Sequence, residues 1–164
     1  MPNFNRLQTA FGWLVLAQAA HSVEEYVGRL WEGFPPARYL TGLVSADREV
    51  GFLVINIGLV AFGVACYVWP VRRRWRAATG LIWFWVVIQL INGIGHPLWT
   101  IRQGVYTPGV LTAPILLALA LYLTYLLRAV APAEVPPHIG NAAPNGPTGP
   151  TGPTAEKRNA ADQR

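Results

Sequence analysis

Four long apolar stretches place the strongest constraint on the fold of this chain. They run over about residues 7–27, 50–69, 77–99 and 109–130, and each has the roughly 20 residues that a helix needs to cross a bilayer. None alternates polar and apolar residues as a barrel strand does. Charged residues make up only 13% of the chain, against about 25% in soluble domains. The sequence therefore predicts an all-α membrane protein, a four-transmembrane-helix bundle.

A cluster of arginines between the second and third stretches indicates how the bundle is oriented. It consists of Arg72, Arg73, Arg74 and Arg76. Because basic loops stay in the cytoplasm, four spans would place both termini there as well. The bias toward arginine over lysine favours a bacterial source, so we expect a bacterial cytoplasmic membrane. The expected partners are the lipid bilayer and a lipid-like small molecule. Nucleic acid is not expected as a partner, because basic residues placed between two spans indicate a cytoplasmic loop.

The two ends of the chain need separate interpretations. Residues 132–164 are rich in Pro, Gly, Thr and Asn and lack apolar periodicity, which predicts a disordered tail. Near the other end, Ala17-Gln18-Ala19 resembles a signal-peptidase site, and cleavage there would leave three spans. The apolar pattern continues past this site, and a single arginine precedes it. We therefore expect the first stretch to remain as a span.

Polar side chains interrupt the apolar stretches, although a charged group near the bilayer centre costs roughly 2.5–3.5 kcal/mol. They lie on three stretches: His21, Glu24 and Glu25 on the first, Asn56 on the second, and Asn92 and His96 on the third. The helical period places those of the first stretch close together and those of the third on one face. Because neighbouring spans are antiparallel, all of these residues fall in the same half of the membrane. The sequence thus predicts one shared polar pocket between the first three spans.

Three motifs follow one another along the chain: His21-Ser22-Val23-Glu24-Glu25, then His96 after Asn92, then Tyr106-Thr107-Pro108-Gly109. In this order they resemble the HXXEE family of integral membrane proteins, whose pattern also includes a second histidine and a Tyr-x-Pro-Gly element. The resemblance covers about residues 7–127. It supports a site made of the motif residues and implies no particular reaction. We expect four central residues, His21, Glu24, Glu25 and His96, and three supporting residues, Asn56, Asn92 and Tyr106.

The first hypothesis for this site is a metal centre. A helical His and Glu three or four residues apart can bind one metal together, and His96 would add a second imidazole. A set of two His and one carboxylate with open positions suits one divalent metal, zinc or iron. The metal ligands would come from His21, Glu24, Glu25 and His96, and the spare glutamate could act as a general base. The ligands are too few for a di-iron centre.

Two further hypotheses remain open. Glu24 and Glu25 could form a metal-free acid–base pair, with His21 and His96 as proton shuttles, for isomerisation or cyclisation of a lipid-like substrate. Alternatively, the polar groups could join the helices of a non-catalytic binding or structural protein. Metal analysis separates the first hypothesis from the other two.

Overall fold

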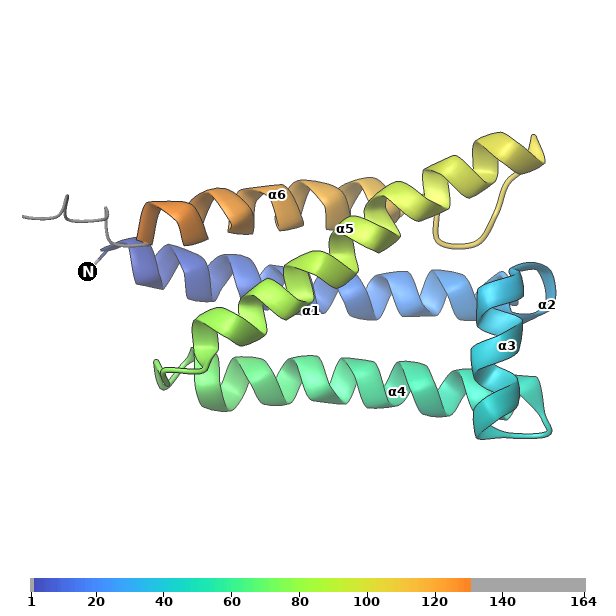
Figure 1. Cartoon of the computed structure of the whole chain (residues 1–164), viewed down its shortest axis with the longest axis horizontal. Helices are drawn as coiled ribbons and strands as arrows, with labels where there is room; N and C mark the ends of the chain where they lie inside the picture. The colour runs from blue at the N-terminus through green and yellow to red at the C-terminus, as the bar shows by residue number, and fades with distance from the viewer. Residues whose placement is uncertain (1, 131–164) are drawn as a thin grey trace, which may run out of the picture. The chain divides into compact units, whose positions relative to one another are not determined.

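The computed structural model describes residues 2–130, so the tail predicted over residues 132–164 lies outside it. The described part is all-α, as predicted (Figure 1). It contains six α-helices and one π-helical turn, which are α1 (Pro2–Val27), α2 (Leu30–Gly33), α3 (Pro35–Val44), α4 (Arg48–Cys66), the turn η1 (Tyr67–Val71), α5 (Ala78–Gln103) and α6 (Ala113–Val130).

Helices α1, α4 and α6 run lengthwise, α5 crosses α1 obliquely, and α6 packs against both α1 and α5 (Figure 1). Two stretches, Arg48–Val71 and Ala78–Gln103, are long and apolar enough to cross a membrane. These correspond to the second and third predicted spans. Helix α6 is apolar but shorter. The structure therefore supports the all-α class and two candidate spans, whereas four spans remain a prediction.

The predicted boundaries differ from the helices mainly at the start of α6. We expected a helix from residue 109, but α6 begins at Ala113. Gly109 has a φ of 92°, a left-handed conformation that a right-handed helix does not contain. Helix α5 also continues to Gln103 with Pro97 inside it. It ends where Gly104 adopts a φ of 68° and its N–H bonds to the carbonyl of Thr100, a common way to end a helix.

The segment between α1 and α4 forms two short helices across one end of the bundle. Helix α3 runs across the direction of the long helices in Figure 1 and packs against α4. We call α2 and α3 together the cover. A small apolar cluster of Leu30, Trp31 and Phe52 holds the cover in place. Asp47 then caps α4 by accepting hydrogen bonds from the N–H groups of Glu49 and Val50, which lack partners within the helix.

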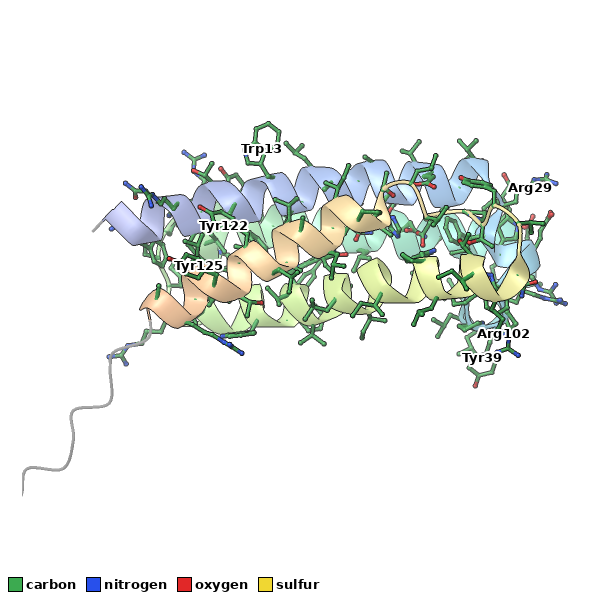
Figure 2. The ribbon with its side chains drawn as sticks, turned by 90° about the horizontal axis from the view of Figure 1, so that it is seen from above. Trp13, Arg29, Tyr39, Arg102, Tyr122 and Tyr125 are labelled. Atoms are coloured by element: carbon green, nitrogen blue, oxygen red, sulfur yellow. The ribbon has the colours of Figure 1, made fainter. Side chains whose placement is uncertain are left out.

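The turn that carries the arginine cluster, residues 72–76, lies at the opposite end of the bundle from the cover (Figure 1). The chain around residues 72–76 lies beside the start of α1, where Gln8 Nε2 donates to the carbonyl oxygen of Val71 over 2.8 Å (Figure 1). Figure 2 shows Tyr122 and Tyr125 toward this end, and Arg29 and Arg102 at the other. We call these the arginine end and the cover end.

The apolar core of the bundle lies toward the arginine end. Phe11 from α1 and Trp85 from α5 meet edge to face there, with ring centroids 6.4 Å apart, and both are fully buried. Further along α1 and α5 toward the cover end, the buried side chains become polar, beginning with Gln18 and Gln89. The core thus fixes α1 against α5, and the candidate site lies between the same two helices.

Candidate functional site

Three side chains from two helices converge between α1 and α5. His21 and Glu25 are one helical turn apart on α1, and His96 comes from α5. His21 Nε2 lies 3.3 Å from Glu25 Oε1, and His96 Nε2 lies 3.2 Å from the same oxygen. The imidazole centroids are 4.7 Å apart, and the three residues are 0%, 8% and 7% exposed. This buried His–Glu–His cluster, His21, Glu25 and His96, could hold a metal ion, because its ligand atoms all lie within 4.8 Å of one another.

The orientation of His96 is set by the segment that follows α5. Its Nδ1 lies 2.8 Å from the carbonyl oxygen of Pro108. A carbonyl oxygen only accepts hydrogen bonds, so Nδ1 must carry the proton. In the neutral ring, Nε2 then has the free electron pair, and this is the atom that faces Glu25. The ring is also flanked by Phe34, with centroids 6.3 Å apart.

The orientation of His21 is set by Thr112, one residue before α6. His21 Nδ1 lies 2.6 Å from Thr112 Oγ1. The same hydroxyl donates to Glu24 Oε2 over 2.6 Å. His21 Nε2 is left facing Glu25, and it is buried with no hydrogen-bond partner in the described part of the chain. Such an unpartnered buried nitrogen is rare and costly.

Glu24 does not belong to the His–Glu–His cluster, although it is adjacent to Glu25. Its carboxylate accepts hydrogen bonds from the backbone N–H groups of Gly109, Leu111 and Thr112, at 2.9–3.0 Å. It also accepts from the hydroxyl groups of Thr112 and Tyr106. The N–H groups just before a helix lack partners within it, and a carboxylate is well placed there. Glu24 therefore caps the start of α6 from a neighbouring helix.

Gly109 allows the segment before α6 to pass directly over both imidazoles. A Cβ atom on Gly109 would lie 2.5 Å from His96 Nδ1 and Cε1, and 2.9 Å from His21 Cε1. Its φ of 92° is in any case unfavourable for other residues. The Pro-Gly pair in the third motif thus has two local functions: Pro108 supplies a carbonyl to His96, and Gly109 leaves room for the rings.

A chain of buried amides continues from the cluster toward the apolar core. Gln89 Nε2 donates to Gln18 Oε1 over 2.7 Å, and Gln18 Nε2 donates to Ser22 Oγ over 3.1 Å. Asn92, on the same helix as Gln89, also belongs to this chain, because its Nδ2 donates to Gln89 Oε1 over 3.1 Å. Asn92 lies one turn before His96 on α5 and bonds to the amide chain. Of these bonds, the one between Gln89 and Gln18 joins α5 to α1 beneath the cluster.

Asn56 and Tyr106, two of the expected supporting residues, lie outside the cluster. Asn56 donates to the carbonyl of Phe52 on its own helix and lines an apolar groove of about 430 Å³ between α1 and α4. The polar pocket predicted between three spans is therefore centred on α1, α5 and the segment before α6, and α4 does not contribute to it. Tyr106 is largely exposed, and its hydroxyl donates to Glu24. Partial burial and this hydrogen bond raise the pKa of Tyr106 above its usual value.

Thr112 is the residue at the site that the sequence analysis missed. It lies in the predicted fourth span, where a threonine has an ordinary explanation as a helix residue. Its position three residues after Gly109 was the available signal, because a hydroxyl at the start of a helix commonly bonds to neighbouring groups.

Comparison with known proteins agrees with the motifs. The model of a family described as "Protein of unknown function with HXXEE motif" matches residues 13–123. No curated protein and no solved structure matches the chain. The matched range includes both histidines, both glutamates of the motif and the segment that passes over them. The chain therefore belongs to the HXXEE family.

Proposed function

We propose that this chain is a metal-dependent membrane enzyme that binds one divalent ion through His21, Glu25 and His96. The observation that carries the proposal is the convergence of three acceptor atoms on one buried point. Both Nε2 atoms face Glu25 Oε1, at 3.3 and 3.2 Å. With neutral rings and an ionised carboxylate, three electron pairs would repel one another there. A cation between them removes this repulsion.

The types of donor atom and the two nitrogen–oxygen distances fit a transition metal. Two ligand atoms at about 2.0–2.1 Å from a tetrahedral ion lie roughly 3.3 Å apart, close to the two nitrogen–oxygen distances of the cluster. Metal-bound histidines commonly use the second ring nitrogen to donate to a carbonyl or another oxygen. His96 donates to Pro108 in this way, and His21 Nδ1 lies 2.6 Å from the Thr112 hydroxyl oxygen, which can accept a hydrogen bond in the same manner. Zinc and iron(II) are the ions that this set favours.

The number of ligands supports a catalytic site over a structural one. Structural zinc sites have four protein ligands, whereas catalytic sites have three and leave a position open. The cluster found in residues 2–130 offers three. When bound, the metal would supply a Lewis acid for water or a substrate oxygen. The chain's own residues would hold the ligands in place and exclude bulk water, because His21 is fully buried.

Elemental analysis of the detergent-purified full chain tests the metal. We expect close to one zinc or iron per chain, and loss of that metal in the His21→Ala/His96→Ala double variant. The matched control is His138→Ala, which removes the third histidine of the chain and should keep the metal. Equal metal content in all three proteins, or none in the unsubstituted protein, would contradict the proposal.

The described surface supports a membrane location. Large apolar side chains are exposed on several of the long helices, among them Trp13, Ile57, Ile91 and Ile115. A soluble monomer rarely exposes so much apolar surface. We infer that four helices span a bacterial cytoplasmic membrane, with the arginine end and both termini in the cytoplasm and the cluster toward the outer half. Release of the protein from membranes by alkaline washing without detergent would contradict this.

The metal-free acid–base alternative has one observation in its favour, since protons could also separate the three acceptor atoms. Such a site would need a second carboxyl group beside Glu25. The neighbouring carboxylate, Glu24, is instead occupied by five hydrogen bonds from residues 106–112. Activity that survives complete metal removal would favour this alternative.

A further inference from the structure

We propose that Glu24 and Thr112 are positioning residues that fix the tautomer of His21, so that its Nε2 keeps the free electron pair. This inference deepens the proposed function, because that electron pair is the one a metal would use. The first glutamate of the motif would then be neither a ligand nor a base. It would control a ligand through a hydroxyl group.

The argument depends on the single proton of the Thr112 hydroxyl. Two acceptors lie within reach of it, Glu24 Oε2 at 2.6 Å and the carbonyl oxygen of Gly109 at 3.4 Å. While Glu24 is ionised, neither of these oxygens carries a proton to donate to Thr112. The hydroxyl proton of Thr112 therefore points toward Glu24 and Gly109. The Thr112 oxygen therefore faces His21 Nδ1 as an acceptor, over 2.6 Å. His21 must donate from Nδ1, which leaves Nε2 unprotonated in the neutral ring.

Glu24 also holds the whole segment that reaches the two imidazoles. Its oxygens bind three backbone N–H groups of residues 109–112, in addition to two hydroxyls. The same segment supplies the Pro108 carbonyl that orients His96. One carboxylate thus supports the outer hydrogen bonds of both histidines. Second partners of this kind typically change metal affinity by about 10–100-fold when they are removed.

The first measurement reads the tautomers directly and needs no metal. The full chain, with ¹⁵N-labelled histidine and the substitution His138→Ala, is purified metal-free and studied by NMR at alkaline pH. Nitrogen shifts and couplings distinguish a ring protonated at Nδ1 from one protonated at Nε2. We expect both His21 and His96 in the Nδ1–H form. Thr112→Val should release His21 from this form and leave His96 in it, whereas Thr112→Ser should keep both.

Glu24→Gln provides a second variant with the same expected direction. A glutamine offers one acceptor oxygen in place of two. If this oxygen keeps the N–H groups of Gly109 and Leu111, the NH2 group faces Thr112, and the Thr112 hydroxyl proton becomes available to His21 Nδ1, which would favour the Nε2–H form. The matched control for Thr112→Val is Thr124→Val. It makes the same change at a hydroxyl in α6 that bonds to the Ala120 carbonyl of its own helix. This control should change neither histidine. It also shows how much the loss of a threonine hydroxyl alone affects the fold.

The second measurement titrates the metal-free proteins with Zn²⁺ against a competing chelator. We expect Thr112→Val to bind about 10–100-fold more weakly, and Thr112→Ser and Thr124→Val to bind as the unsubstituted chain does. If the unsubstituted chain binds no Zn²⁺ but shows the expected tautomers, the proposed function fails and the positioning inference stands. If Thr112→Val and Glu24→Gln both leave His21 in the Nδ1–H form, the positioning inference is overturned.

Discussion

Replacing Gly109 with alanine is the sharpest test of how the segment before α6 packs on the two imidazoles. The new Cβ atom would lie 2.5 Å from two atoms of the His96 ring and 2.9 Å from His21 Cε1. Carbon atoms in contact are normally about 3.5–4.0 Å apart. His96 is buried and bonded to the Pro108 carbonyl. The ring can therefore move away only by giving up that bond.

The expected cost has two parts, which a matched control separates. A non-glycine residue at positive φ costs of order 1–3 kcal/mol, and overpacking a filled site costs roughly 1–3 kcal/mol more. Gly104 also has a positive φ, of 68°, but an added Cβ there would meet no atom within 4 Å. Gly104→Ala should therefore show the first cost alone. Gly109→Ala should show both, and should be the less stable variant by about 1–3 kcal/mol.

The assay is equilibrium unfolding of both variants in the same detergent, followed by Zn²⁺ titration of the metal-free proteins. We expect Gly109→Ala to bind Zn²⁺ at least tenfold more weakly, because displacement of His96 breaks its bond to Pro108. Gly104→Ala should bind as the unsubstituted protein does. Equal stability and equal Zn²⁺ affinity in the two variants would refute the packing of Gly109 against both rings.

Two further predictions concern groups around the cluster. Gln89→Leu should lower the free energy of unfolding by about 1–3 kcal/mol, because it leaves the buried Gln18 Oε1 without its donor. In denaturation curves, the Gln18→Leu/Gln89→Leu double variant should recover part of this loss. Strictly additive losses from the two substitutions would contradict the hydrogen bond. Burial and the hydrogen bond to Glu24 raise the pKa of Tyr106 in the folded protein, so its stabilising contribution is complete below about pH 10 and is lost as pH rises through the raised pKa. Unfolding measured over an alkaline series should show a smaller decline for Tyr106→Phe, and identical declines would contradict this.

The helices and the position of the polar residues along them could be predicted from the sequence, because both follow from local periodicity. The apolar runs correspond to α1, α4 and α5, and the polar positions on α1 and α5 do come together toward the cover end. What periodicity cannot supply is the rotation of one helix against another. Asn56 was expected to share the pocket, yet its side chain bonds to its own helix. Packing of α4 decides this, and it is a property of the assembled bundle.

The start of α6 illustrates a different limit of sequence reasoning. Residues 109–112 have apolar neighbours and would suit a helix by composition. Three of their four backbone N–H groups bond instead to Glu24, more than 80 residues earlier in the chain. Such a long-range cap has no local signature except the Pro-Gly pair. For the same reason the sequence offered only a weak signal for Thr112, its position three residues after Gly109.

The two glutamates of the motif show most clearly where spacing stops being informative. On a helix, positions three and four residues after His21 lie on either side of it, and both are within reach of its ring. Spacing alone therefore leaves Glu24 and Glu25 equivalent as partners of His21. Adjacent residues point about 100° apart, however, so the two carboxylates cannot both face the same third residue. His96 of α5 lies on the side of Glu25, at 3.2 Å, and the segment before α6 lies on the side of Glu24. Two adjacent acids can thus take different tasks: Glu25 faces the imidazoles, and Glu24 holds the segment that orients them.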